Sequence, residues 1–270
     1  MERIDISGVP ETMIQTLYAR AKESRKSNHR IYDGKAIEVV EKLDYDFAAA
    51  DRDFAMSAGV IARTILLDGM VKEYVGKHPN ALVINIACGM DTRYYRVDNG
   101  QIQWVNIDLP ETIAVRRRFL QETGRVSMVA CSAMDEAWTE QVQSGRRDVL
   151  VIVEGLTMYL TEGDVGKILG IVAGHYPGAT IFMEIMNPKF VGRDIEKSIK
   201  NSNAGFTWGA KSGEELCGLA QGIAWLGDRS LAETMPEIMG VYRVIGKIPA
   251  IRNLSNKISV LECGRGESKK

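Results

Sequence analysis

The chain contains 270 residues, of which 45% are hydrophobic and 26% are charged, and its formal net charge is -1. This composition is typical of a globular protein with enough apolar residues for a core, and the length fits one large α/β domain or two small ones. A nearly neutral chain is not drawn to nucleic acid or to an acidic membrane, so the charge argues against both partners. We therefore expect a small-molecule partner.

The cysteines and the ends of the chain point to an ordinary intracellular protein. The four cysteines are widely spaced, and no pair has the spacing of metal ligands, so we expect reduced thiols and no metal site. Residues 1–14 do not resemble a signal peptide, and no apolar run approaches the length of a membrane span. These features predict a cytoplasmic protein.

Residues 10–74 are expected to form helices. Apolar residues recur at helical spacing in 13–18, in 36–43 and in 60–71. Arg63 lies within the last of these segments, and a lone arginine in a helix usually faces solvent. We take residues 1–75 as a helical cap.

The stretch 82–108 predicts a strand, a sharp turn, a short helix and a second strand. Residues 82–86 are apolar apart from Asn85, which is typical of a parallel strand buried on both faces. Residues 103–107 form a second apolar run, which ends at Asp108. The gap from Gly89 to Asp108, about twenty residues, matches that between a glycine turn and a ribose-binding carboxylate.

The same turn argues against a dinucleotide. A pyrophosphate needs several glycines and a helix N-terminus, but this loop has one glycine, Gly89, and carries Asp91 where an anion would lie. A positively charged nucleoside without phosphates, S-adenosylmethionine, fits better, because Asp108 could accept hydrogen bonds from its ribose. The alternative is an ordinary turn with a capping aspartate.

Downstream, strands alternate with helices. We expect strands at 126–131, 149–153 and 179–183, a helix at 110–123 with Arg116 to Arg118 on its outer side, and a helix that begins at the capping box of Thr161. This alternation predicts a doubly wound parallel sheet, in which ligands bind at the carboxyl ends of the strands. The polar residues expected at those ends are Asp91, Asp108, Ser132 and Glu154.

The last third of the chain is less regular. Residues 187–211 lack periodicity and read either as an insertion over a pocket or as a surface crossover. Beyond it we expect a helix capped by Ser212, a strand at 223–228, a helix at 237–248 and a closing antiparallel edge strand at 257–262.

The expected organisation is a single domain in four parts. We expect a mostly parallel, Rossmann-like α/β sheet with an antiparallel edge strand and an N-terminal helical cap. The parts are a helical cap (1–75), a cofactor-binding core (76–186), an insertion (187–211) and the C-terminal part of the sheet (212–270).

Five blocks of sequence resemble the leucine carboxyl methyltransferase family, which includes polyketide-synthesis O-methyltransferases of the tetracenomycin type and the methyltransferases of protein phosphatase tails. The blocks are 8–12 (GVPET) with 18–21 (YARA), 31–33 (IYD), 85–93 (NIACGMDTR), 107–110 (IDLP) and 154–160 (EGLTMYL). Family members usually have glycine, alanine and glycine where this chain has Ala87, Cys88 and Gly89, so one glycine is lost.

The resemblance implies roles in binding S-adenosylmethionine. It implies that Gly89 lets the backbone approach the cofactor and that Asp108 binds the ribose. It also places Arg63 on the cofactor's carboxylate, because a guanidinium can bind that group with two hydrogen bonds. The other positions it implies are Ser132 and Ala133 beside the adenine, Glu154 near the amino group and sulfonium, and Arg20, or else Lys22, as a second cation. Asp91 is a further candidate for cofactor binding, because the sulfonium tolerates a carboxylate nearby.

The acceptor is expected to be a small molecule with a carboxylate. A neutral hydroxyl would need a base, usually histidine, but none of the three histidines falls at a strand end. A carboxylic acid is already ionised and needs only positioning. A phenol served by His29 is the alternative, and Tyr159 is a second candidate for the catalytic position.

Two other classes of function stay open at this stage. One is a nicotinamide-dependent oxidoreductase on the same type of sheet, and the other is a non-catalytic module that binds S-adenosylmethionine. The sequence leaves the oligomeric state undetermined, with a homodimer as one option.

Overall fold

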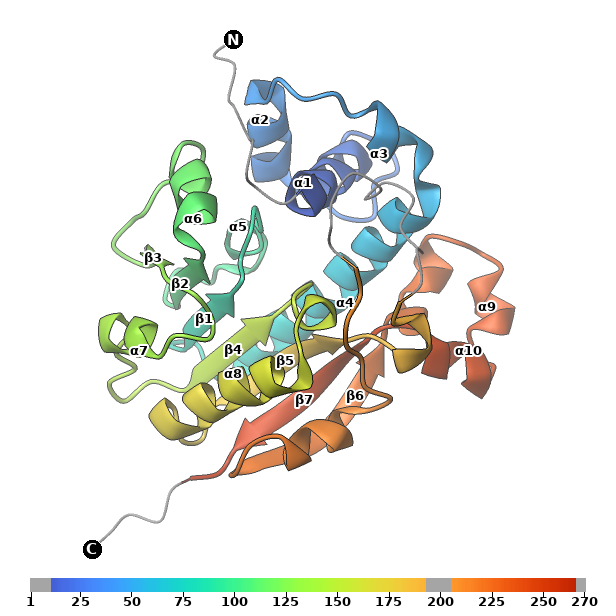
Figure 1. Cartoon of the computed structure of the whole chain (residues 1–270). Helices are drawn as coiled ribbons and strands as arrows, with labels where there is room; N and C mark the ends of the chain where they lie inside the picture. The colour runs from blue at the N-terminus through green and yellow to red at the C-terminus, as the bar shows by residue number, and fades with distance from the viewer. Residues whose placement is uncertain (1–10, 193–204, 266–270) are drawn as a thin grey trace, which may run out of the picture.

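The structure is a computed structural model and describes residues 11–192 and 205–265. Its centre is a seven-stranded sheet in the order β3-β2-β1-β4-β5-β7-β6 (Figure 1). The strands are β1 (Leu82–Ile86), β2 (Gln103–Asp108), β3 (Val126–Ala130), β4 (Val149–Val153), β5 (Thr180–Ile185), β6 (Ile223–Ser230) and β7 (Lys257–Cys263).

Strands β1 to β5 are parallel, and β7 runs antiparallel to both β5 and β6. The predicted α/β fold with a doubly wound, mostly parallel sheet is confirmed. The reversed strand at 257–263, however, lies one position inside the edge, because β6 pairs along its outer side.

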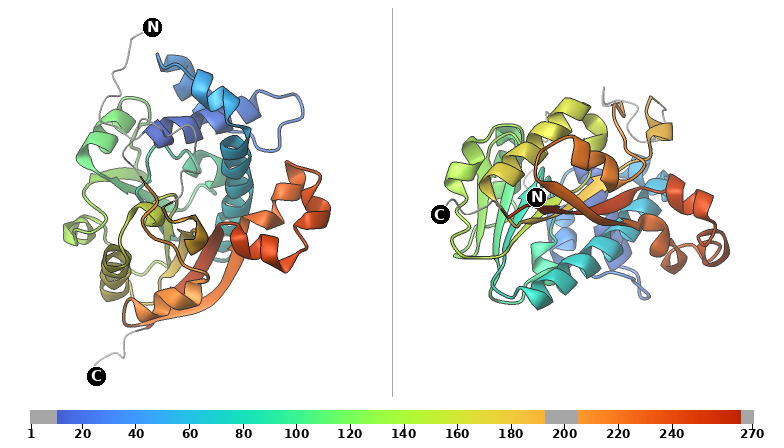
Figure 2. Two further views of the ribbon diagram at one scale, coloured as in Figure 1. Left: turned by 45° about the vertical axis from the view of Figure 1, so that its right-hand side comes forward. Right: turned by 90° about the horizontal axis from the view of Figure 1, so that it is seen from below.

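Helices cover both faces of the sheet, as the view from below shows (Figure 2). Helices α4 (Phe54–Lys77) and α5 (Tyr94–Val97) pack on one face. Leu67 of α4 belongs to the same apolar cluster as Trp104 of β2. Helices α7 (Ala137–Gln141) and α8 (Glu162–His175) pack on the other. Strands β1 and β4 are buried at every residue, which explains their nearly continuous apolar sequences.

The N-terminal helices form a layer beyond the carboxyl ends of the central strands. Helices α1 (Glu11–Ser24) and α2 (Gly34–Lys42) share an apolar cluster with Cys88, Met90 and α6 (Pro110–Arg117). Helix α3 (Ala48–Arg52) follows, before α4 begins at the cap of Asp53. The three predicted apolar segments therefore correspond to α1, α2 and α4. Apolar side chains of α1 and α2 pack against the loop at 87–91.

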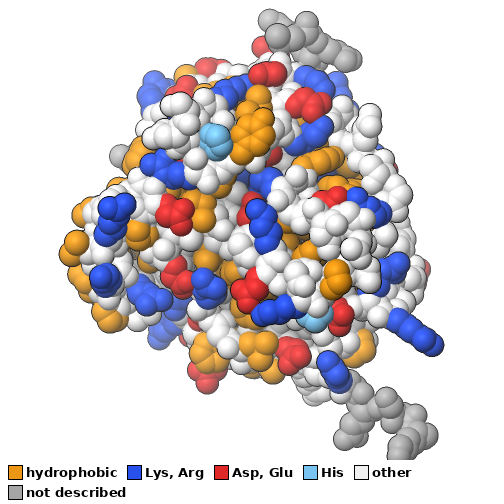
Figure 3. Space-filling model, turned by 180° about the vertical axis from the view of Figure 1, so that it is seen from behind, with side chains coloured by type: hydrophobic (Ala, Val, Ile, Leu, Met, Phe, Trp, Pro, Cys, Tyr) orange, Lys and Arg blue, Asp and Glu red, His pale blue; other side chains and the backbone are white. Residues whose placement is uncertain are grey.

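Helix α4 corrects one expectation from the sequence. Among the described residues it alone is long and apolar enough to cross a membrane, with a mean hydropathy of 1.5 over its most apolar 18 residues. In the structure 56% of this stretch is buried, because α4 packs against the sheet as a core helix does. The view from behind shows basic, acidic and apolar side chains interspersed over that face of the molecule (Figure 3), in keeping with the nearly neutral chain.

The helix predicted for 110–123 is shorter than expected. It ends at Arg117, after which Phe119 and Leu120 turn inward to join the apolar cluster of α1 and α2. Arg116, expected on the outer side with its two neighbours, is 2% exposed and therefore buried. The prediction for Arg116 was wrong because its side chain has a backbone partner inside the protein, which helical periodicity does not reveal.

Two predicted helices near the C-terminus are wrong. In place of a helix capped by Ser212 the chain forms a 3-10 helix, η4 (Gly213–Gly218), whose first N–H donates to Asp228 at 3.1 Å. In place of a helix at 237–248 it forms short pieces, because Gly240 and Gly246 disfavour a continuous helix. The short elements in this range are η6 (Met235–Glu237) and α9 (Tyr242–Ile245), flanked by η5 (Leu231–Glu233) and α10 (Pro249–Leu254).

The described parts of the expected insertion lie beside the end of β4. Residues 187–192 contain η2 (Pro188–Phe190), and residues 205–211 return along η1 (Thr157–Tyr159), where the Thr207 N–H donates to the Met158 carbonyl at 2.8 Å. Residues 193–204 of this segment, and residues 8–10 of the first family block, lie outside the described residues.

Candidate active site

The carboxyl ends of β1, β2 and β4 meet at one edge of the sheet. Ile86 of β1 is in register with Ile107 of β2 and with Val153 of β4. The residues that follow these three, Ala87, Asp108 and Glu154, therefore come together at that edge.

The loop after β1 adopts left-handed backbone conformations at two positions. Gly89 has a φ of 46° and Ala87 has a φ of 53°, the latter being the one non-glycine residue with positive φ in the described chain. The Gly89 N–H donates to Asp108 Oδ2 at 2.7 Å, and the Leu109 N–H donates to Oδ1 at 2.7 Å. Burial raises the pKa of Asp108, although these backbone hydrogen bonds oppose the rise.

Arg93 joins three carboxylates next to this loop. Its guanidinium is 1% exposed and binds Asp68 through Nε at 2.7 Å, Asp91 through Nη1 at 3.0 Å and Glu154 through Nη2 at 2.7 Å. Asp91 also accepts the Arg93 backbone N–H at 2.9 Å. The polar turn predicted at 91–93 is therefore a junction between α4, the first loop and the end of β4.

Arg63 of α4 lies on the other side of Glu154. Its Nη1 donates to Glu184 Oε2 at 2.9 Å, and its Nε lies 2.6 Å from Glu154 Oε1 without hydrogen-bonding geometry. Glu184, on β5, also accepts from the Gly155 N–H at 2.9 Å and from Asn256 at 3.0 Å. Arg63 is thus part of the buried polar network and does not face solvent.

A second arginine connects the N-terminal helices to the loop. Arg20 of α1 binds Asp33 at 3.1 Å and donates to the Met90 carbonyl at 3.0 Å. Asp33 accepts in addition from Arg96 at 2.6 Å and from the Thr92 hydroxyl. Asp33 therefore ties the helical cap to the residues beyond β1.

We call this network the strand-end cluster. It consists of Arg20, Asp33, Arg63, Asp68, Asp91, Arg93, Arg96, Asp108, Arg116, Glu154 and Glu184. Burial alone would raise the pKa values of Asp91 and Glu154, but Arg93, with Arg96 or Arg63 respectively, holds both below their usual range. These two carboxylates are therefore ionised at neutral pH.

The comparison with protein families decides the assignment. A family model described as leucine carboxyl methyltransferase matches residues 13–173, more than half of the chain. The chain belongs to the leucine carboxyl methyltransferase family.

Relatives of this methyltransferase support a common cofactor. It is 30% identical over 262 residues, 93% of this chain and 96% of the relative, to the tetracenomycin polyketide synthesis O-methyltransferase TcmP of Streptomyces glaucescens. It is 27% identical over 237 residues, 79% of each chain, to the S-adenosyl-L-methionine-dependent methyltransferase dpfgK of Gibberella zeae. The chain is an S-adenosylmethionine-dependent methyltransferase, so the nicotinamide and non-catalytic alternatives are set aside.

A solved structure shows that the fold is shared. The crystal structure of a duf574 family protein from Streptomyces avermitilis superimposes with a TM-score of 0.61 at 13% identity, over 95% of this chain and 98% of the other.

The strand-end cluster of this methyltransferase fits the cofactor's charges. The Nε atom of Arg116 is buried and has no hydrogen-bond partner among the described residues, whereas Arg63 Nε is ion-paired with Glu154 at 2.6 Å. An unpaired buried donor such as Arg116 Nε can receive the carboxylate of a ligand, while the ionised Asp91 and Glu154 suit a positive charge. The methionine part of S-adenosylmethionine carries both signs, so the residues present match the group.

Ser132 and Ala133 follow β3, the strand next to Asp108. The Ser132 hydroxyl accepts the Met134 N–H at 3.3 Å, and the Ala133 carbonyl accepts the Trp138 indole N–H at 3.4 Å. The neighbouring Cys131 N–H donates to the Asp108 carbonyl at 2.9 Å. This turn therefore lies beside Asp108, as the sequence predicts.

The two candidate catalytic residues lie in different places. Tyr159 is in η1, just beyond Glu154, and its ring centroid is 5.6 Å from that of Phe206. His29 is exposed in the α1–α2 loop, where its described contacts are the Lys26 carbonyl at 3.1 Å and the ring of Tyr32. Tyr159 therefore follows the end of β4, whereas His29 lies in the exposed loop between α1 and α2.

Sequence reasoning missed several members of the cluster. Asp68 was assigned to an ordinary helix, Glu184 fell beyond the predicted end of its strand, and the partners of Arg96 and Arg116 were not foreseen. A signal was present for Glu184, since an acidic residue within an apolar strand segment is rarely buried without a partner.

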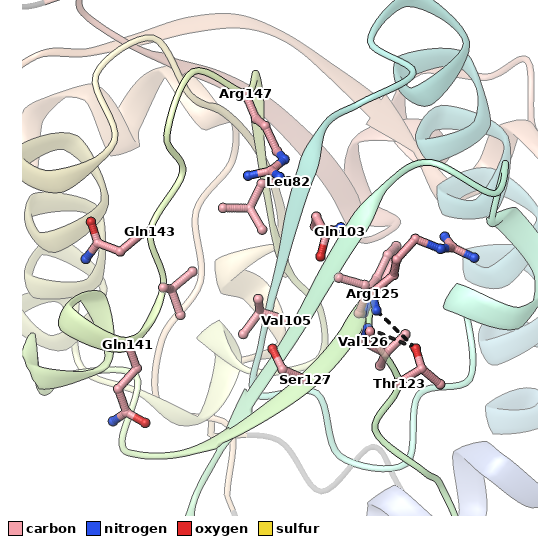
Figure 4. A pocket seen from close by; sticks show the side chains of 13 residues that line it. Leu82, Gln103, Val105, Thr123, Arg125, Val126, Ser127, Gln141, Gln143 and Arg147 are labelled. Atoms are coloured by element: carbon pink, nitrogen blue, oxygen red, sulfur yellow. Dashed lines mark hydrogen bonds between the residues drawn. The ribbon is translucent and has the colours of Figure 1, made fainter.

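A separate cavity of about 180 Å³ lies at the opposite, amino edge of the sheet (Figure 4). The first residues of three strands line it, together with polar side chains from the loops: Leu82, Gln103, Val126, Ser127, Gln141, Gln143 and Arg147. It is small for a nucleoside cofactor and has none of the strand-end carboxylates. We therefore take the carboxyl edge, with its buried charges, as the candidate site.

Proposed function

We propose that this methyltransferase transfers the methyl group to a carboxylate oxygen of a small organic acid. The relative TcmP is a polyketide synthesis O-methyltransferase by name, and the matching family model is that of a carboxyl methyltransferase, which supports transfer to oxygen. The acceptor class follows from the groups around the strand-end cluster.

The observation that carries the proposal is the placement of the histidines. The sequence has three, and all lie in the described ranges. His78 binds Asp148 at 3.0 Å before the start of β1, and His175 lies 3.8 Å from Glu136 at the end of α8. With His29 exposed in its loop, no imidazole lies in contact with the strand-end cluster.

The other titratable groups nearby are also poor bases at neutral pH. Burial raises the pKa of the Cys88 thiol to about 12. Asp91 and Glu154 have lowered pKa values and are engaged by arginines. A base works best when its pKa lies near the working pH, so deprotonation of a neutral hydroxyl has little support here. A carboxylate acceptor, ionised above a pKa of about 4, needs no base.

When bound, S-adenosylmethionine supplies an electrophilic methyl group on its sulfonium. The residues of this chain have to hold the cofactor and exclude water. We assign the ribose to Asp108, the cofactor's carboxylate to Arg63 with Arg20 as a second cation, and its amino group and sulfonium to Glu154 and Asp91. Orienting two reactants in this way can contribute roughly 7–11 kcal/mol in favourable cases.

The experiment is product analysis with a labelled methyl group. The full chain is incubated with S-adenosylmethionine carrying a labelled methyl group and a panel of aromatic and aliphatic acids, each paired with its phenol or alcohol counterpart. Mild alkali then releases labelled methanol from a methyl ester and leaves an aryl ether intact. We expect an alkali-labile product from the acids.

His29→Gln serves as the variant that separates the two acceptor classes. Carboxylate methylation should proceed at the wild-type rate in this variant, since His29 has no part in it. An alkali-stable product whose formation requires His29 would overturn the proposal in favour of a phenol.

A further inference from the structure

Glu184 of β5 lies behind the candidate site and holds two parts of it. Its side chain is 1% exposed and therefore closed to a ligand, whereas the side chain of Arg63 is 15% exposed. Glu184 Oε2 accepts from Arg63 Nη1 at 2.9 Å and from the Gly155 N–H at 2.9 Å. The Glu184 backbone carbonyl also accepts from the Thr157 hydroxyl at 2.7 Å. One residue therefore fixes both the guanidinium of α4 and the loop that follows β4.

The contacts of Arg63 leave one of its nitrogens for a ligand. Nη1 donates to Glu184, and Nε lies 2.6 Å from Glu154 Oε1. Within the described residues no hydrogen bond or ion pair uses the third nitrogen, Nη2. Because the guanidinium is planar and rigid, Nη2 cannot turn without moving the other two nitrogens. The two carboxylates therefore set the direction of Nη2, and Glu184 is the more deeply buried of them.

Asn256 fixes Glu184 from the C-terminal part of the chain. Its Nδ2 donates to the other carboxylate oxygen of Glu184, Oε1, at 3.0 Å. Asn256 directly precedes β7, and its carbonyl accepts at 2.9 Å from the N–H of Leu231, which directly follows β6. The last two strands therefore hold the backbone of Asn256. Since a carboxylate only accepts hydrogen bonds, Asn256 has to present its donor side to Glu184.

We propose that Asn256 and Glu184 are positioning residues for cofactor binding, which act through Arg63 to aim a donor at the carboxylate of S-adenosylmethionine. Neither residue touches the ligand. The affinity of α4 for the cofactor then depends on an amide at the start of the last strand. This inference rests on the assignment of Arg63 in the proposed function and is independent of the acceptor.

The test compares two ligands on the full chain without acceptor. One is S-adenosylmethionine, and the other is its decarboxylated form, which keeps the sulfonium and the amino group but has no carboxylate. Asn256→Asp places a second carboxylate against Glu184, and the repulsion should move Glu184 out of line with Arg63. In calorimetry the dissociation constant should rise about tenfold for S-adenosylmethionine and less than about twofold for the decarboxylated ligand.

A merely structural role for Asn256 predicts a different result. A general loss of fold would weaken both ligands equally, and that outcome would overturn the proposal, as would unchanged affinity for S-adenosylmethionine. If Asn256→Asp does not fold, Asn256→Ala removes the donor without adding a charge. It should then show a smaller loss that is again confined to S-adenosylmethionine.

A second substitution should rescue the first. When Glu184→Gln is combined with Asn256→Asp, the glutamine carbonyl can accept from Arg63 and Gly155 while its amide donates to the introduced carboxylate. This double variant should recover most of the lost affinity. A folded double variant that binds as weakly as Asn256→Asp alone would contradict the proposal.

Asn99→Ala is the matched structural control. Asn99 lies in the turn before β2, where its Oδ1 accepts from the N–H groups of Gln101 and Ile102 at 2.9 Å and 3.0 Å. Its loss should lower the melting temperature while both ligands keep their wild-type affinity. Arg63→Lys separates the two levels of the argument. If it weakens S-adenosylmethionine binding and Asn256→Asp does not, only the positioning role fails, whereas if neither variant does, the assignment of Arg63 fails as well.

Discussion

The two edges of the central sheet use polar residues in different ways. At the carboxyl edge the side chain of Arg93 is 1% exposed and binds three carboxylates. At the amino edge the side chains of His78 and Asp148 lie 3.0 Å apart and are 35% and 64% exposed. The amino edge has a defined cavity, and the carboxyl edge has the buried charges. The difference teaches that a set of buried, mutually dependent charges and a surface cavity can lie at opposite edges of one sheet, and it is the charges that we propose as the cofactor site.

Arg93→Met tests the largest expected effect, because it leaves three carboxylates without their common partner. Breaking a buried ion pair from one side typically costs about 3–5 kcal/mol, and we expect a loss of that order in the free energy of urea unfolding. Arg118→Met, at an exposed arginine directly after the end of α6, should change stability by less than about 0.5 kcal/mol. If the two variants lost the same unfolding free energy, the expected difference between buried and exposed arginines would be contradicted.

The same change should alter the response to acid. The lowered pKa values of Asp91 and Glu154 contribute stability that is present above their ordinary values and is lost as pH falls toward the folded-state values. Unfolding free energies measured between about pH 6 and about pH 3 should therefore fall more steeply for the wild type than for Arg93→Met.

Asp108→Ala should weaken cofactor binding without unfolding the chain. Charged hydrogen bonds contribute roughly 1.5–3 kcal/mol each, so the dissociation constant for S-adenosylmethionine should rise at least tenfold in calorimetry. The control is Arg147→Ala at the amino edge, which should bind the cofactor as the wild type does. If Arg147→Ala is the weaker binder, the site has been placed at the wrong edge.

Arg63→Lys tests whether cofactor binding requires the planar shape of the guanidinium, because the substitution keeps the positive charge. An ammonium cannot bind two carboxylates and a ligand with the geometry of a guanidinium, so we expect roughly a tenfold loss of cofactor affinity. The melting temperature, measured alongside, separates loss of binding from loss of fold. Wild-type affinity in a folded lysine variant would show that Arg63 only balances charge.

Ala87→Gly has the smallest expected effect and should be stabilising. A residue with a Cβ in the left-handed region is strained by about 1–2 kcal/mol, partly offset by the greater flexibility of glycine in the unfolded chain. We expect a net gain of about 0.5–1 kcal/mol in urea unfolding. Ala81→Gly, a buried alanine without positive φ, should lose stability instead.

The sequence predicted the strand ends well because the signals there are local. Apolar runs with a polar residue directly after them located Asp108, Ser132 and Glu154, and family resemblance raised Arg63 from a surface residue to a candidate ligand of the cofactor. The lost glycine was also visible, and the structure shows that Ala87 occupies a backbone conformation that glycine prefers.

The pairings within the cluster could not be predicted in the same way. Arg63 and Glu184 are 121 residues apart, and Arg20 reaches Met90 across 70. Periodicity reports which side of a helix is apolar, but it does not report a buried arginine such as Arg116 whose partner is a distant carbonyl. The helix expected at 237–248 failed for another reason, since Gly240 and Gly246 disfavour a continuous helix.

The position of Glu184 has a consequence for synthesis of the chain. Arg63 leaves the ribosome 121 residues before the carboxylate that binds it, and Asp33 precedes Arg96 by 63. Until β5 has emerged, the first half of the protein carries arginines and apolar helices that have no complete set of partners. Nascent chains that end before residue 184 should therefore depend on chaperones. In chains that include β5, Arg63 can bind Glu184.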